Sequence, residues 1–325
     1  MTDKEKWITI LVCFCLLILL AGFGAYKGKT VQTGIADVKD LQGKTIGGVN
    51  GRMPENSAKV FFESMLGVRL GGYKAYDTVE EALYALKTGK VSAVWATNVT
   101  ADYLVKKYSG SIQDAGNDSD NPDTDKSRNA SKNMNDLRLG ILSTDGMASI
   151  SQLPEGRFEF GFALKNDNKG KALTEKLNEA INGIIASDIY RELVEKYIVN
   201  ATTAEKFTPK DMAVSDSAYK KAYGKEGAIR VGITGATEPI ELIDVTGKPY
   251  GFCVAFMDEI GQRLGRTIEF EVLDNETIFT SLMSGRIDAV FCYGTPGQIT
   301  TEGTKNWIMS DGYLRCNGYR LVTLR

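Results

Sequence analysis

The chain has 325 residues, of which 43% are hydrophobic and 25% are charged, a composition typical of a globular protein with room for two domains. Its formal net charge is -2, with Lys and Arg dispersed along the chain, so we predict no surface for nucleic acid. Histidine is absent. This excludes Ser-His-Asp and Cys-His catalysis and removes the commonest metal ligand. We therefore predict a protein that is not an enzyme and that holds no metal or cofactor.

The amino-terminal segment is strongly apolar. The run from Trp7 to Tyr26, WITILVCFCLLILLAGFGAY, carries no charge. It is long enough to cross the roughly 30 Å of hydrocarbon in a bilayer. We predict that residues 1–30 form a single membrane anchor and that the rest of the chain lies outside the cytoplasm. Secretion after cleavage of a signal peptide is the alternative, with Gly22 and Gly24 as a poor cleavage site.

Three cysteines follow this apolar run, Cys253, Cys292 and Cys316, and none belongs to a CxxC pair. Their odd number and their spacing predict neither a disulfide framework nor a zinc site. Cysteine is among the residues most often buried. We therefore interpret these three as small core residues.

Helical and strand-like patterns alternate from Lys39 to Gly110. The segment KTIGGVNG predicts a strand, PENSAKVFFESML a helix, VEEALYALKTG a second helix that ends at Gly89, and VSAVWA another strand. Such alternation is typical of an α/β layer with a mostly parallel sheet.

The middle of the chain contains two polar stretches. Residues 113–135 are rich in Asn, Asp and Ser and predict a flexible, solvated insertion. Their DSDNPDTD run lacks the glycine and the final glutamate of a calcium loop, so we predict no metal there. A strand from Phe158 and amphipathic helix over residues 171–198 follow, and residues 201–225 are a polar linker.

From Ala228 the strand–helix pattern begins again. We predict a strand, a hairpin at Thr246–Lys248, a helix that ends at Gly265 and a further strand. ETIFTSLMSGRIDAVFCY then aligns without a gap on the earlier EEALYALKTGKVSAVWAT, with Asp288 in the place of Ser92. Two copies of one β-α-β-α-β unit predict two similar lobes. Ligands of open α/β sheets bind beyond the carboxyl ends of the strands, so two such edges that face each other would form a cleft.

Six segments together resemble the bacterial extracellular solute-binding proteins of family 3, the amino-acid-binding branch with the type II periplasmic-binding-protein fold. The segments are AIRVGITGATEPIELIDVTGKPYGFCVAFMDEIGQRLG, SLMSGRIDAVF, TTEGTKNWIMSDGYLRCNGYRLV, DVKDLQGKTIGGVNG, EEALYALKTGKVSAVWAT and FGFALKNDNKGKALTEKLNEAINGIIASDIYRELVEKYI. The resemblance implies a two-lobed α/β fold that closes on a small solute.

The order of the lobes is the reverse of the order in the family, which indicates a circular permutation. A slice of a tandem array, with lobes from two successive modules, is the alternative. The expected parts are an anchor or signal segment (1–30), a lobe equivalent to the family's second lobe (37–160), a closing strand and helices that pack on the other lobe (161–200), a polar linker (201–225) and a lobe equivalent to the family's first lobe (226–325).

The charged groups with which the family holds an amino acid are missing from this sequence. Gly303 stands where the resemblance expects the arginine for the α-carboxylate, and Thr97 stands where it expects the carboxylate for the α-ammonium. Burial of an unpartnered zwitterion is costly, so a standard amino acid is a less favoured ligand. We interpret Asp288 as a structural residue of its turn.

The residues that we predict to line the cleft come from both lobes. Arg52 follows a predicted strand and precedes a helix, where the helix amino terminus favours an anion. For Trp95, a core role is the alternative to a ligand platform. The predicted ligand-binding residues are Gly51, Arg52, Met53, Trp95, Thr97, Asn98, Glu238, Ile240, Tyr293, Gly294, Thr295 and Thr300.

The favoured hypothesis is a membrane-tethered, extracytoplasmic protein that captures a small polar solute for an ABC-type transporter permease or a membrane sensor. The alternative is a degenerate binding fold that serves as a structural or interaction module. An enzyme is the least favoured hypothesis, because Glu238 and Glu241 are its only obvious catalytic carboxylates.

Overall fold

The computed structural model describes most of the chain after the apolar amino-terminal run, and the predicted anchor of residues 1–30 lies outside the described residues. Residues 35–325 form one compact unit. In the described part of the chain, no helix combines the length and the apolar character needed to span a membrane. The described ranges are 34–49, 55–108, 137–142, 158–204, 207, 209–214, 226–293, 305–316 and 318–325.

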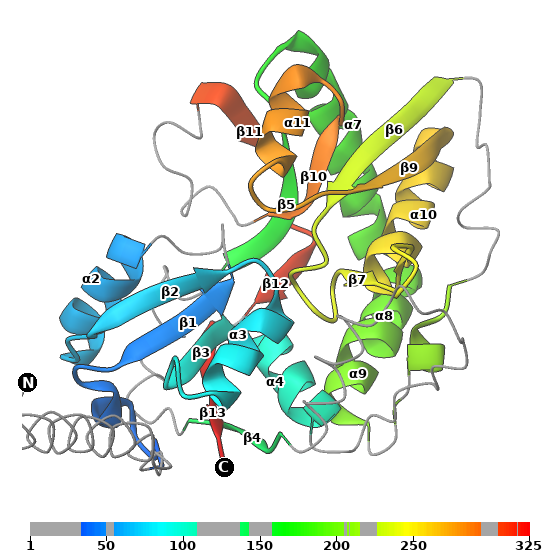
Figure 1. Ribbon diagram of the computed structural model, residues 1–325. Coiled ribbons are helices and arrows are strands. Elements are labelled where there is room, and N and C mark those ends of the chain that lie inside the picture. The colour runs from blue at the N-terminus through cyan, green and yellow to red at the C-terminus, as the bar shows by residue number, and fades with distance from the viewer. Residues whose placement is uncertain are drawn as a thin grey trace, which may run out of the picture. The chain divides into compact units, whose positions relative to one another are not determined.

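The amino-terminal lobe is built on a five-stranded sheet (Figure 1). Its strand order is β2-β1-β3-β13-β4. β1 is parallel to β2 and β3, whereas β13 is antiparallel to β3 and β4. The strands are β1 (Thr45–Val49), β2 (Gly72–Tyr76), β3 (Ala93–Thr97), β4 (Leu139–Ile141) and β13 (Tyr319–Leu324).

Among the described residues, four helical segments accompany this sheet. Thr78 caps α3 by accepting a hydrogen bond from the backbone N–H of Glu81, and Gly89 follows the helix with a positive φ of 72°. Asp37 and Asp40 form a capping box around the first 3₁₀ turn. The segments are η1 (Val38–Leu41), α2 (Glu55–Leu66), α3 (Val79–Lys87) and α4 (Asn98–Lys106).

The carboxyl-terminal lobe contains a six-stranded sheet. Its main order is β11-β5-β10-β6-β9, and β12 pairs with the other end of β5. β6 is parallel to β9 and β10, whereas β5 is antiparallel to β10. The strands are β5 (Phe158–Lys165), β6 (Glu226–Ile233), β9 (Arg266–Val272), β10 (Ala289–Tyr293), β11 (Trp307–Met309) and β12 (Leu314–Cys316).

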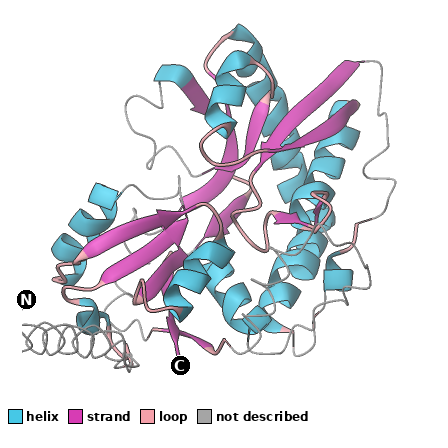
Figure 2. Ribbon diagram, viewed as in Figure 1, coloured by secondary structure: helices cyan, strands magenta, loops and turns pink. Residues whose placement is uncertain are grey.

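The helices of this lobe cover its sheet, and a small hairpin stands beside them (Figure 2). The helix α10 ends at Gly265 and α11 ends at Gly285, and both glycines adopt the left-handed conformation expected of a helix stop. The remaining elements are α7 (Asn168–Ile185), α8 (Asp188–Val194), η5 (Glu195–Val199), α9 (Asn200–Thr203), η6 (Pro209–Met212), α10 (Phe252–Leu264), α11 (Ile278–Ser284) and the hairpin strands β7 (Leu242–Ile243) and β8 (Pro249–Tyr250).

The predicted internal repeat is confirmed, since β1-α2-β2-α3-β3 and β6-α10-β9-α11-β10 have the same strand order. The two lobes also exchange strands. Next to β3 lies β13, the last strand of the chain, and next to β10 lies β5, which precedes the whole second repeat. Each sheet is therefore completed by a strand from the other half of the chain.

Helix α4 contributes to the hydrophobic cores of both lobes. Ala101 and Leu104 belong to a buried cluster of the amino-terminal lobe, and Val99 and Tyr103 belong to the large cluster of the carboxyl-terminal lobe. Residues four apart share one face of a helix. The two faces of α4 thus join the lobes.

The structure differs from the sequence-based expectations at several places. The predicted lobe 226–325 gives its last strand, β13, to the other sheet. The helical stretch 171–198 is interrupted at Ser187, whose hydroxyl donates a hydrogen bond to the carbonyl oxygen of Ile184 at 2.6 Å. Side chains such as serine compete with the backbone for such hydrogen bonds, and this favours helix ends.

Candidate functional site

Half of the predicted ligand-binding residues lie outside the part of the chain that the structure describes, namely Gly51, Arg52, Met53, Gly294, Thr295 and Thr300. For Tyr293, only the backbone is described, at the end of β10. The hypothesis that Arg52 binds an anion therefore stays a prediction. The five other residues fall in two regions, the loop after β6 and the junction of β3 with α4.

The loop of residues 234–240 follows β6 and contacts both lobes. Ile240 is fully buried in the core of the carboxyl-terminal lobe. Four residues earlier, Ala236 is buried in the hydrophobic cluster of the other lobe, which includes Val49 and Val79. This loop lies at the carboxyl end of a parallel strand, where α/β sheets bind ligands. It therefore forms part of the boundary between the lobes.

Glu238, in the same loop, forms an ion pair across this boundary. The Nζ of Lys107, at the carboxyl end of α4, donates to both carboxylate oxygens of Glu238, at 3.1 and 3.2 Å. The same ammonium lies 3.6 Å from Glu80. Burial alone would lower the pKa of Lys107, but Glu238, Tyr108, Glu80 and Tyr103 together outweigh burial and raise this pKa well above its usual value.

Thr97 and Asn98 start helix α4. The Oγ1 of Thr97 accepts a hydrogen bond from the backbone N–H of Thr100 at 3.2 Å, and it donates to the hydroxyl of Thr100 at 3.0 Å. The backbone N–H of Asn98 donates to the carbonyl oxygen of Gly318 at 2.9 Å, which ties α4 to the segment that leads into β13. Thr97 is thus a helix cap.

Trp95 lies inside the amino-terminal lobe. Only 4% of the residue is exposed. Its ring meets Phe62 edge to face at 5.2 Å between centroids and stacks on Tyr319 at 4.8 Å. This environment favours the core role over the ligand platform.

The end of β10 is shaped by a bulge at Cys292. This residue has a φ of 56°, which is uncommon for any residue other than glycine. Its backbone N–H donates to the hydroxyl of the buried Tyr313 at 2.8 Å. The pairing of β10 with β5 shifts between Val290 and Tyr293. The bulge therefore bends the end of β10.

The two carboxylates considered for catalysis are both engaged within the fold. Glu238 pairs with Lys107, as described above. Glu241 is fully buried and accepts a hydrogen bond from the hydroxyl of Thr234 at 2.9 Å. Burial also raises the pKa of the nearby Cys253 thiol to about 12, which keeps it protonated.

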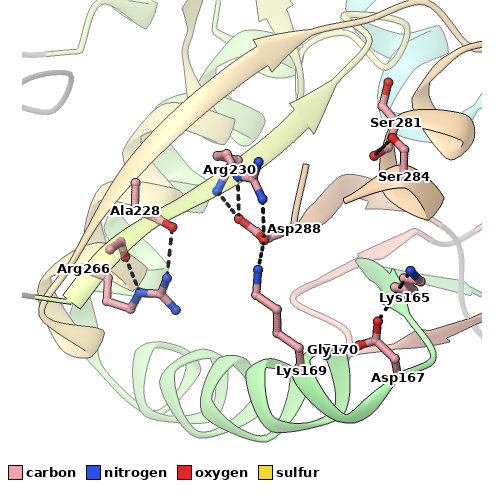
Figure 3. A network of polar contacts seen from close by, with 11 residues as sticks. Lys165, Asp167, Lys169, Gly170, Ala228, Arg230, Arg266, Ser281, Ser284 and Asp288 are labelled. Atoms are coloured by element: carbon pink, nitrogen blue, oxygen red, sulfur yellow. Dashed lines mark hydrogen bonds and ion pairs between the residues drawn. The ribbon is translucent and has the colours of Figure 1, made fainter. Parts of the chain in front are cut away.

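The repeated turn before β10 contains a polar network (Figure 3). The guanidinium of Arg230 donates to both oxygens of Asp288, at 3.0 and 3.1 Å, and Lys169 donates to the same carboxylate at 2.8 Å. Burial raises the pKa of Asp288, but these hydrogen bonds outweigh that effect and hold it at about 2. The location of Asp288 within this turn fits its interpretation as a structural residue.

Sequence reasoning did not identify Lys107. Helix α4 was not among the predicted elements, although Thr97 followed by Val99 and Tyr103 is a cap before an amphipathic run. Glu238, its partner, is 131 positions away. No local pattern connects the two.

The family-model comparison concerns the second half of the chain. Residues 229–323 match the model of the bacterial extracellular solute-binding proteins, family 3. This segment includes the loop after β6, the bulged end of β10 and the crossing into β13. The match confirms the resemblance over these residues. No curated protein matches the chain.

Solved structures of binding proteins show distant likeness. The L-cystine solute receptor of Neisseria gonorrhoeae is 25% identical over 26% of this chain and 34% of the receptor, with a TM-score of 0.22. A phosphate-binding protein of Streptococcus pneumoniae is 10% identical over 87% and 88% of the two chains, with a TM-score of 0.34. A putative L-cystine ABC transporter of Listeria monocytogenes is 12% identical over 87% and 83%, with a TM-score of 0.35. The likeness to the family therefore rests on the sequence match over residues 229–323.

Proposed function

We propose that this chain, whose residues 229–323 carry the family 3 solute-binding sequence, is an extracytoplasmic binding protein that holds a small polar solute between its two lobes. It would present that solute to an ABC-type transporter permease or to a membrane sensor. The observation that carries the proposal is the loop of residues 234–240. It follows a parallel strand, belongs to the matched segment and contacts the opposite lobe.

The apolar run from Trp7 to Tyr26 supports attachment to a membrane as part of this proposal. Attachment would keep the lobes close to a partner in the same membrane. The alternative of a secreted form is distinguished by the mass of the mature protein, since cleavage near Gly24 would remove the apolar run.

We infer that the solute is not a standard free amino acid. At the two positions where the family resemblance expects charged groups for its α-ammonium and α-carboxylate, this chain has no such groups. The Thr97 hydroxyl caps α4. Gly303 has no side chain to pair with a carboxylate. An ion buried without a partner costs several kcal/mol, so a neutral or singly charged polar solute is favoured.

The alternative function is an interaction module that binds no solute. The observation in its favour is the Lys107–Glu238 pair, since the two charges that face each other across the lobe boundary already neutralise each other. In that case the two lobes would serve as one rigid surface for a protein partner.

Thermal unfolding of the full-length chain in detergent, with a panel of sugars, amino acids, polyamines, and organic and inorganic anions, distinguishes the two functions. A solute at 100 times its Kd stabilises the folded state by about 2.7 kcal/mol, so the unfolding temperature rises. A dose-dependent rise for one class of solute supports the binding protein. The same unfolding temperature with every compound contradicts it and favours the interaction module.

A further inference from the structure

We propose that Lys107 and Glu238 form an internal clasp that keeps the two lobes together, and that the lobes separate only when this ion pair breaks. The proposal concerns the equilibrium between joined and separated lobes. It is independent of which solute or partner binds.

The geometry places the clasp at the end of a stripe on α4. Val99, Tyr103 and Lys107 are spaced four residues apart and so share one face of the helix. Val99 and Tyr103 are buried in the core of the carboxyl-terminal lobe. Lys107, the third of these residues, lies on the same face of α4 and brings a charged group to the interface between the lobes.

The ammonium of Lys107 is shielded from water, and the carboxylate of Glu238 compensates its charge. The Lys107 side chain is 21% exposed and that of Glu238 is 12% exposed. Two tyrosine rings stand near the ammonium, Tyr103 at 5.9 Å and Tyr108 at 5.5 Å from Nζ. The carboxyl end of a helix also favours a cation. If one partner is removed, the contact across the boundary is lost and the other charge is less well compensated where it is shielded from water, which favours exposure to water and therefore separation of the lobes.

A second contact joins the lobes at equivalent loops of the repeat. The side-chain amide of Asn275, before α11, donates to the carbonyl oxygen of Asp77, before α3, at 3.4 Å. This bond is long and exposed, so it contributes little. The apolar face of α4, the Ala236 contact and the hydrogen bond that Lys106 donates to the carbonyl oxygen of Asn200 at 3.4 Å provide the remaining attraction, and the clasp adds an ion pair between the lobes.

Lobe separation is measured by double electron–electron resonance, which gives the distribution of distances between two spin labels on the full-length chain. The labels are attached at Lys90→Cys in the amino-terminal lobe and Val245→Cys in the hairpin of the other lobe, both exposed positions. Cys13 and Cys15 are replaced by Ser, and Cys253, Cys292 and Cys316 are buried. The parent chain is expected to give one narrow distance distribution.

Lys107→Met and Glu238→Gln are each expected to add a longer distance and to increase the separated fraction at least fivefold. Combining the two is expected to add no more than either alone, because both break one interaction. Lys107→Arg retains the pair and is expected to keep the narrow distribution.

The matched control is Glu80→Gln. It removes the other carboxylate near Lys107, at 3.6 Å, but Glu80 belongs to the same lobe as the lysine. Its distribution is expected to match the parent. An unchanged narrow distribution in both Lys107→Met and Glu238→Gln would overturn the proposal, as would equal separation in Glu80→Gln. If Lys107→Met fails to fold, Glu238→Gln alone decides, since it keeps the shape of the side chain.

Discussion

Asp288 and Ser92 occupy equivalent positions in the two lobes, and the residue opposite each one explains why they differ. The backbone N–H of Asp288 donates to the carbonyl oxygen of Arg230, and that of Ser92 donates to the carbonyl oxygen of Thr45. Arg230 supplies a guanidinium to the carboxylate. Thr45 is uncharged, so the first copy of the repeat has no cation for a carboxylate to pair with, and a serine occupies the position.

The depressed pKa of Asp288 predicts how stability depends on pH. The unfolded carboxyl titrates near 3.8 and the folded one at about 2, so the ionised group stabilises the fold above pH 4. This contribution, at most about 2 kcal/mol, is lost as the pH falls from 4 toward 2. We expect Asp288→Asn to lower the free energy of unfolding at pH 7 by about 2 kcal/mol and to flatten the pH dependence in that window.

Urea unfolding at a series of pH values checks this prediction. The comparison variant is Ser92→Asp, which places a carboxylate opposite Thr45 and is expected to give no gain in stability. Equal pH profiles for Asp288→Asn and the parent would contradict the prediction.

Trp95 lies in the core of the amino-terminal lobe, so we expect its substitution to lower stability and to leave solute binding unchanged. Trp95→Ala is expected to lower the free energy of unfolding by about 3–5 kcal/mol, because a large buried ring leaves a cavity. Tyr84→Ala, at a ring that is 44% exposed, is expected to change it by less than about 0.5 kcal/mol. Loss of solute affinity in a folded Trp95→Phe protein would show instead that the ring contacts ligand.

At the scale of elements, α4 depends on its cap. Thr97→Ala removes the oxygen that accepts from the Thr100 N–H and is expected to cost about 1 kcal/mol in the free energy of unfolding. Thr97→Ser retains that oxygen and is expected to stay within about 0.5 kcal/mol of the parent. Thr97→Asp also retains a cap, and it adds the carboxylate that the family resemblance expects. A gain of amino-acid binding in Thr97→Asp, with unchanged stability, would link the ligand class to this position.

Local chemistry predicts elements well and their long-range contacts poorly. Gly89, Gly265 and Gly285 end helices as expected, because only glycine adopts the left-handed conformation there at little cost. The predicted hairpin at Thr246–Lys248 is also confirmed, since β7 and β8 pair in antiparallel fashion around it. By contrast, β13 could not be assigned to its sheet from sequence, since its neighbours β3 and β4 are far away in the chain. The contact between Lys107 and Glu238 could not be predicted for the same reason, because the two residues are 131 positions apart in the chain.

At the scale of the whole molecule, the exchange of β5 and β13 supports the permutation hypothesis. Ile35 packs against the hydrophobic cluster that contains Leu321, so the start of the folded unit and its last strand share one lobe. A chain that joins Arg325 to Ile35 through a short Gly-Ser linker, and that opens between residues 215 and 225 of the predicted polar linker (201–225), would have the order of the family.

We expect this reordered chain to unfold within about 1 kcal/mol of the parent, because the linker changes only loop entropy. Chemical denaturation measures the difference. A chain opened inside α10, between Asp258 and Glu259, is the control and is expected not to fold. If the reordered chain also fails to fold, the permutation hypothesis loses its support and the tandem-array alternative gains.

The exchanged strand also has a consequence for biosynthesis. Strand β3 is made well before its partner β13, which follows the whole second repeat in the chain. Until β13 leaves the ribosome, the edge of β3 that faces away from β1 has no strand beside it, and such edges promote aggregation. The sheet of the amino-terminal lobe therefore stays incomplete until the second repeat and β13 have been synthesised, and a chaperone or export factor that covers this edge of β3 would raise the yield of folded protein.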